Sequence, residues 1–167
     1  TGSEEDRIRL LREACAAGAE YIDVEFKAYK DFPRAAAHLV LSYHDFDKTP
    51  AELESIAGKM KSLGATILKI AVMARGTSDL IRCVRLQKSL GVPSAVIAMG
   101  EFGEPLRILS ARYGGSLTYA SLKPGDETAP GQVAVSELVQ LYQVKALDEA
   151  TEIYGVVGNP VAHSKGP

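Results

Sequence analysis

The chain has 167 residues, of which 46% are hydrophobic and 24% charged, and these proportions are typical of an ordinary globular protein. Its formal net charge of −2 excludes an overall basic field that would attract nucleic acid or anionic lipid. Apolar runs such as residues 95–99 are far too short to cross a bilayer, so we expect no membrane segment. Cys15 and Cys83 lack metal-ligand spacing, and we interpret them as reduced thiols of a cytoplasmic protein.

Helix and strand signals alternate from the start of the chain. Ser3, followed by three acidic residues, predicts the cap of a helix that continues at helical spacing to Gly18. Residues 21–26 and 38–43 predict two strands. Residues 49–64 predict a second helix, which begins with a threonine cap and a proline and ends at a glycine.

The same unit then repeats. Residues 66–71 predict a strand, residues 77–90 a helix that a glycine stops, and residues 94–99 another strand. Strands that begin near positions 38, 66 and 94 are spaced by 28 residues, about the length of one βαβ unit. This alternation predicts a parallel α/β sheet covered by helices, and it fits a (β/α) barrel and a doubly wound sheet equally.

The pattern is looser after residue 99. Residues 116–120 predict a fifth strand and residues 135–142 a final helix, with a loop at 123–132 that is rich in proline, glycine and polar residues. Such a loop is typical of a lid or a binding loop. Residues 143–151 have the character of a linker, and the run at 154–157 predicts the first strand of another domain.

Two side chains could carry covalent chemistry. Lys69 interrupts an otherwise apolar strand, and we expect it at the strand end, where barrel active sites form. Apolar surroundings disfavour an ammonium ion and would leave a nucleophilic amine, although a lysine that reaches solvent along its stem is also compatible. His44 follows the neighbouring strand and could move protons near neutrality, or could simply be a hydrogen-bonding histidine.

Polar residues further along the chain could bind a ligand. Arg107 follows a glycine-containing turn, and as a loop arginine it could clamp a carboxylate or could lie on the surface. Thr128 and Gln132 place a hydroxyl and an amide on the 123–132 loop. The pair Gly155 and Gly158 lacks the third glycine of a dinucleotide fingerprint. No zinc-ligand pair, phosphate loop or serine elbow is present, so no metal is expected.

Seven segments, in order, resemble the C-terminal portion of type I 3-dehydroquinate dehydratase. They are EYIDVEF (20–26), SYHDF with KTP (42–50), LKIA (68–71), AMG (98–100), RILS (107–110), YGGSLTY (113–119) and APGQ (129–132). The resemblance covers residues 4 to about 142. It implies a (β/α)8 TIM barrel, of which residues 1–145 would carry roughly the last five βα units. The first three strands, which in the family supply a glutamate and arginines, would precede this chain.

The resemblance implies a covalent mechanism without a cofactor for the dehydratase. Lys69 would form an imine with the C3 ketone of 3-dehydroquinate, and His44 would remove the C2 proton and protonate the departing C1 hydroxyl. Arg107 would hold the substrate carboxylate with Thr128 and Gln132. Met99 and Tyr119 would pack around the substrate. Asp23 and Glu25 would orient His44.

The end of the chain is similar to the opening of shikimate dehydrogenase. Residues 152–167 would then begin a substrate-binding domain whose NADP domain lies outside this chain. Ser164 would bind the shikimate carboxylate, while Gly166 replaces a second serine and makes room for quinate. Such a fusion implies a multifunctional enzyme of the shikimate pathway, a plastid location if the source is a plant, and a homodimer as one form of assembly.

Two alternatives remain at this stage. Another imine-forming barrel, such as a class I aldolase, would share the lysine but would not explain Arg107 together with the APGQ loop. A non-catalytic fragment that only binds a ligand would need none of these side chains to react.

Overall fold

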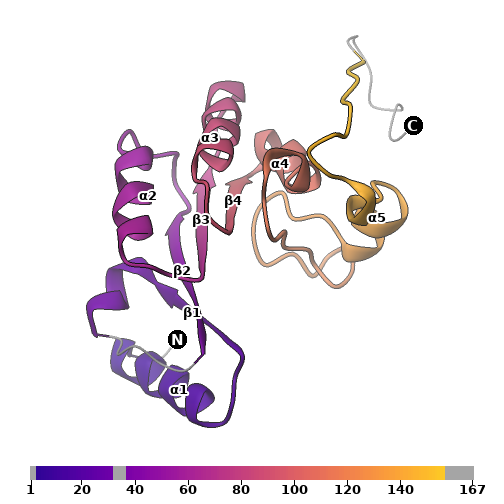
Figure 1. The fold of residues 1–167 in the computed structure, drawn as a ribbon. Helices are drawn as coiled ribbons and strands as arrows, with labels where there is room; N and C mark the ends of the chain where they lie inside the picture. The colour runs from indigo at the N-terminus through magenta and orange to yellow at the C-terminus, as the bar shows by residue number, and fades with distance from the viewer. Residues whose placement is uncertain (1–2, 32–36, 157–167) are drawn as a thin grey trace.

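The computed structural model describes residues 3–31 and 37–156, and a parallel β-sheet lies at its centre (Figure 1). The strands are β1 (Tyr21–Glu25), β2 (His38–Asp45), β3 (Ile67–Met73) and β4 (Ser94–Met99), and they lie side by side in that order. The helices are α1 (Glu4–Ala16), α2 (Leu53–Ser62), α3 (Thr77–Ser89), α4 (Glu104–Ile108) and α5 (Val135–Gln140). The predicted parallel α/β class is confirmed.

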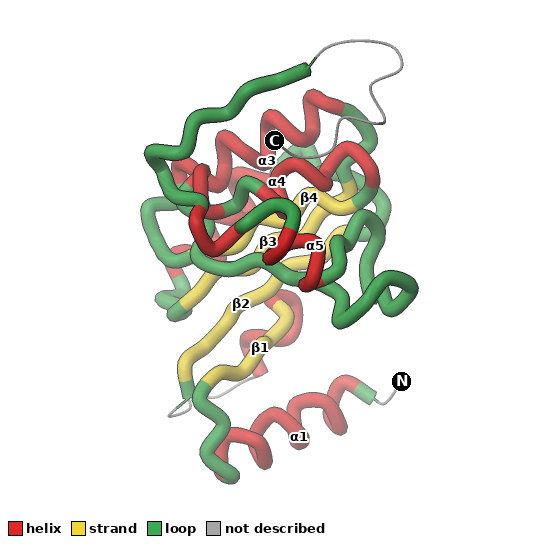
Figure 2. Tube along the Cα trace, turned by 90° about the vertical axis from the view of Figure 1, so that its right-hand side faces the viewer, coloured by secondary structure: helices red, strands yellow, loops and turns green. Residues whose placement is uncertain are grey.

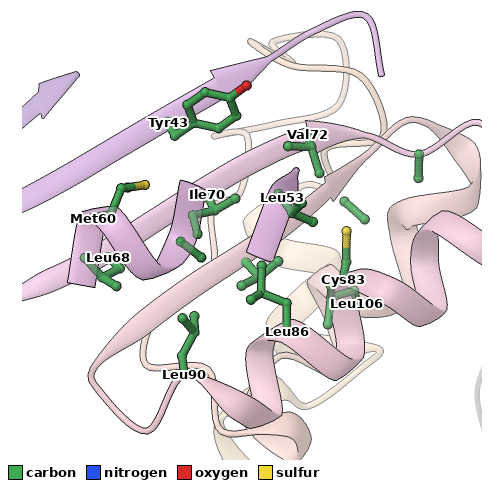
Figure 3. Close-up of a cluster of buried hydrophobic side chains, with 14 of the residues drawn as sticks. Tyr43, Leu53, Met60, Leu68, Ile70, Val72, Cys83, Leu86, Leu90 and Leu106 are labelled. Carbon is green, nitrogen blue, oxygen red and sulfur yellow. The ribbon is translucent and has the colours of Figure 1, made fainter. Parts of the chain in front are cut away.

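One face of the sheet, which we call the outer face, is covered by α2 and α3. Both helices contribute to a single apolar cluster with the strands, which includes Met60 of α2, Leu86 of α3, and Leu68 and Ile70 of β3; Figure 3 shows Met60 beside Leu68 and Ile70. Strands in sequence order with their helices on one face are typical of a (β/α) barrel. A doubly wound sheet reverses its strand order and places helices on both faces. The described part of the chain therefore has the barrel arrangement.

The opposite face, the inner face, is formed by the alternate residues of the same strands. Ala71, Ile97 and Met99 make a small apolar cluster there, against which Tyr119 and Ala129 pack from the segment after β4. Polar side chains lie beside this cluster on β1, β2 and β3. The alternation follows from strand geometry, because successive side chains point to opposite faces.

The segment that follows β4 lies at the opposite end of the sheet from α1, and Figures 1 and 2 agree on this. The fifth strand predicted at 116–120 is wrong, because the described residues contain only the four named strands and one isolated bridge, between Ser121 and Ala134. Ser116 makes a single backbone bond to Ser94 of β4, at 2.8 Å. Two residues later the Thr118 hydroxyl donates to the Arg107 carbonyl at 2.9 Å, which draws the chain toward α4 and away from the sheet.

Two other expectations are corrected. The helix expected from Thr49 begins at Leu53, and the Thr49 hydroxyl donates to the Met73 carbonyl instead of capping the helix. The strand expected at 154–157 is not seen at residues 154–156, which have no regular structure, and the remainder lies outside the described residues. No helix within the described ranges is long and apolar enough to span a bilayer.

Candidate functional site

Lys69 is the third residue of β3 and points from its inner face. The expectation that it lies at the strand end is therefore wrong, since four more strand residues follow it. Its side chain is 15% exposed, and its Nζ lies 2.8 Å from Oδ2 of Asp23. The ring of Tyr119 lies under the ammonium group, with 4.7 Å between Nζ and the ring centroid. Lys69 thus lies between a carboxylate and the face of an aromatic ring.

His44 lies on the same face of β2 and is paired with the other carboxylate of β1. Its Nδ1 lies 2.7 Å from Oε2 of Glu25, and both side chains are mostly buried. Asp23, in contrast, contacts Lys69, so only Glu25 has the geometry expected of a partner that orients His44. The register is consistent with this division. Glu25 is aligned with Ser42 and reaches His44, two residues further along β2, whereas Asp23 is aligned through Val40 with Ile67 and reaches across β2 to Lys69.

A pocket of about 160 Å³ opens beside these residues. Met99 and Tyr119 line it, together with Ala71 and Ile97. The pKa of the Tyr119 hydroxyl is raised. Burial is the largest cause, and the nearby Lys69 ammonium offsets part of this rise. The pocket is therefore lined by both apolar and polar side chains, which suits a small ligand with polar groups on an apolar frame.

Arg107 also lines this pocket, but it belongs to helix α4 and not to a loop as expected. Pro105 stands in the first turn, where proline is tolerated, and Leu106 is buried, which together account for the short helix. Arg107 is only 3% exposed, and burial lowers the pKa of its guanidinium. Its side chain donates to the Pro130 carbonyl at 3.2 Å, whereas its Nε has no partner among the described residues. A buried cation without a carboxylate partner is suited to receive an anion.

The 128–132 turn closes the pocket from the side of α4. The Gln132 amide oxygen accepts bonds from the backbone N–H of Thr128 at 2.8 Å and from its hydroxyl at 3.2 Å. This leaves the amide nitrogen of Gln132 as a donor beside the pocket. The turn itself rests on Gly100: a Cβ at Gly131 would lie 2.5 Å from the Gly100 carbonyl oxygen, so only glycine allows the close approach.

Phe46 is a pocket residue that the sequence did not single out. Its ring stacks on that of His44, with 5.8 Å between centroids and an interplanar angle of 7°. The available signal was its position, two residues beyond His44 and therefore on the same side of the extended chain. A larger hollow of about 610 Å³ lies near Pro93, at the other end of β4, but it contains no histidine and no strand lysine. The chemistry therefore lies in the smaller pocket.

Some expectations concern groups outside this site. Ser164 lies outside the described residues. Within the described ranges, no cluster of histidine, cysteine, aspartate and glutamate could hold a metal ion. The candidate site residues that line the described pocket are Lys69, His44, Arg107, Met99, Tyr119, Thr128 and Gln132.

Known proteins are similar in sequence to this chain. The bifunctional 3-dehydroquinate dehydratase/shikimate dehydrogenase of Arabidopsis thaliana, a chloroplastic protein, is 34% identical over 99% of this chain. The 3-dehydroquinate dehydratase of Desulfotalea psychrophila is 35% identical over 82% of it. The chain spans 29% of the length of the first relative and 66% of the second.

Solved structures agree with the sequence comparisons. The type I 3-dehydroquinate dehydratase of Clostridium difficile, with covalently modified comenic acid, has a TM-score of 0.73 and 26% identity over 87% of this chain and 63% of that one. The enzyme of Aquifex aeolicus has a TM-score of 0.67 and 27% identity, over 85% of this chain and 66% of the other. The family model for type I 3-dehydroquinase matches residues 1–149. This chain belongs to the type I 3-dehydroquinase family.

Proposed function

We propose that this chain carries the imine-forming part of an enzyme that dehydrates 3-dehydroquinate to 3-dehydroshikimate. The observation that carries the proposal is the meeting, in one pocket, of a strand lysine, a carboxylate-paired histidine and a buried arginine that has no carboxylate partner among the described residues. The substrate has a ketone, an acidifiable C–H bond and a carboxylate. Each of these three groups matches one of the three side chains.

The reaction begins at Lys69. Its amine attacks the C3 ketone, water leaves, and the resulting iminium acts as an electron sink that makes the C2 proton acidic. His44 removes this proton and can then donate it to the C1 hydroxyl, which departs as water. A carboxylate is only an acceptor, so the bond from His44 to Glu25 keeps the ring proton on Nδ1 and leaves Nε2 as the base. Hydrolysis of the imine then releases 3-dehydroshikimate and regenerates Lys69.

Arg107 orients the substrate in this scheme. A carboxylate that enters the pocket would satisfy the guanidinium, and such charge-assisted bonds are stronger than neutral ones. The amide nitrogen of Gln132 supplies a further donor from the 128–132 turn, and Thr128 orients that amide because its backbone N–H and its hydroxyl both donate to the amide oxygen. Met99 and Tyr119 then bound the ring of the substrate.

The match to the Arabidopsis protein extends over 99% of the chain and supports a longer, fused arrangement. Residues 1–145 would belong to the dehydratase barrel, and residues 152–167 would begin an NADP-dependent shikimate or quinate dehydrogenase. In this proposal the dehydratase needs no cofactor, and NADP serves only the second domain. A plastid or cytoplasmic location and a homodimer belong to the same proposal.

Borohydride trapping tests the dehydratase function. The full-length protein is mixed with 3-dehydroquinate and sodium borohydride, and the adduct is located by peptide mass spectrometry. A reduced adduct on Lys69, absent from Lys69→Met, supports the proposal. An adduct formed only with sugar aldehydes would indicate an aldolase-type barrel. The absence of any adduct would indicate a protein that binds its ligand without covalent chemistry.

A further inference from the structure

The two carboxylates of β1 serve two different partners, although they lie only two residues apart on one face. Glu25 bonds to His44, while Asp23 bonds to Lys69 at 2.8 Å. An ammonium ion has no lone pair, so Lys69 must lose a proton before it can attack a ketone. Asp23 is the group in contact with that proton, since the Nδ1 of His44 is already bonded to Glu25.

We propose that Asp23 is a catalytic base that accepts a proton from the Lys69 ammonium at the start of imine formation. The inference rests on the proposed dehydratase function and assigns Asp23 a role distinct from the orientation of His44. The ammonium carries three protons. Asp23 takes one as the nitrogen lone pair forms the C–N bond, and this proton is returned to the carbonyl oxygen. A second proton then passes from the nitrogen to the same oxygen, which leaves as water. The third proton stays on the iminium nitrogen, so atoms and charge balance.

The surroundings of Asp23 favour such a shuttle. Its side chain is 40% exposed, against 15% for Lys69, so the carboxylate lies nearer to solvent than the ammonium group does. Charged or titratable groups that face it are Lys69 from β3, Arg7 from α1 and Tyr119 from the segment after β4, with Glu25 on its own strand. Asp23 does not line the pocket, so it can hold the proton without meeting the substrate.

The test measures imine formation alone, by rapid-quench borohydride trapping in the full-length protein across neutral and alkaline pH. Asp23→Asn keeps the shape and an oxygen that accepts a bond from Lys69, but it removes the proton acceptor. Trapping should slow by about 10²-fold at neutral pH, and should then recover by about tenfold per pH unit as hydroxide replaces the carboxylate. Asp23→Glu should retain the wild-type pH profile at a reduced rate, which covers the case in which Asp23→Asn fails to fold.

Glu25→Gln is the matched control on the same strand. It should lower turnover while the adduct still accumulates, because it acts on His44 and not on the amine. The inference is overturned if Asp23→Asn traps substrate at the wild-type rate, or if it slows trapping by one factor at every pH, which is the mark of a purely structural role. In both cases the wild-type adduct would still support the dehydratase. A wild-type protein that forms no adduct would instead remove the proposed function itself.

Discussion

The two faces of the β1–β4 sheet are made by the same strands but differ in every property that matters for function. On the outer face, Leu68 and Ile70 pack against α2 and α3 and are at most 1% exposed. On the inner face, the residue between them, Lys69, keeps part of its side chain exposed and is paired with Asp23. Adjacent residues of one strand thus separate stability from chemistry. Substitutions that alternate along β3 can break or sharpen this contrast.

The largest expected effect is on the inner face. Lys69→Met removes the amine but keeps an apolar stem of similar length, so turnover of 3-dehydroquinate should fall on the order of 10³-fold or more. The free energy of unfolding should change by less than about 1 kcal/mol, because the lost ion pair is partly exposed. Steady-state kinetics and urea denaturation of the full-length protein measure both. Loss of stability in proportion to activity would contradict the separation of the faces.

Leu68→Ala tests the outer face with the opposite result. Leu68 is 1% exposed within the cluster formed with α2 and α3, and its truncation should lower the free energy of unfolding by about 2–5 kcal/mol. Activity per folded molecule at low temperature should remain close to wild type, because the side chain points away from the pocket. Denaturation curves and active-site titration measure the two quantities. A catalytic defect in fully folded protein would show that the faces are coupled.

A smaller effect is expected where the turn closes the pocket. Gly131→Ala places a Cβ 2.5 Å from the Gly100 carbonyl oxygen at a φ of 70°, so the turn must shift and kcat/KM should fall by about 10–100-fold. Gly125→Ala is the matched control, since its φ is 92° but nothing lies within 4 Å of the new Cβ. It carries the backbone strain without the clash. Equal losses in the two variants would show that strain, and not the Gly100 contact, positions the turn.

The last effect concerns the thiol of the outer face, and it is expected only in alkaline solution. Burial raises the pKa of Cys83 to about 12, so in alkaline solution the unfolded chain ionises before the folded one does. The contribution of Cys83 is present below the unfolded pKa of about 8.5, and above it the free energy of unfolding should fall by about 1.4 kcal/mol per pH unit until the folded pKa is reached. Denaturation at successive pH values measures the slope. Cys83→Ala should lose this slope, and an unchanged slope would assign it to other groups.

Several features were predictable because their signals are local. The strand starts recur with the βαβ spacing, and observed starts at His38, Ile67 and Ser94 follow it closely. The predictions of a fifth strand and of the start of α2 were wrong. The Thr118 hydroxyl bonds to the Arg107 carbonyl and the Thr49 hydroxyl to the Met73 carbonyl, and these bonds redirect the chain at the two places. The helix that carries Arg107 was missed because its five residues are too few to show a helical period.

The sequence by itself determined the parallel α/β class and the presence of a lysine and a histidine on neighbouring strands. These follow from patterns within a few residues. Only the tertiary structure decided that Asp23 pairs with Lys69, which is 46 residues away, and that Arg107 is buried with no partner for its Nε in the described part of the chain. Such pairings depend on strand register and on where the segment after β4 packs, and no local pattern encodes either one.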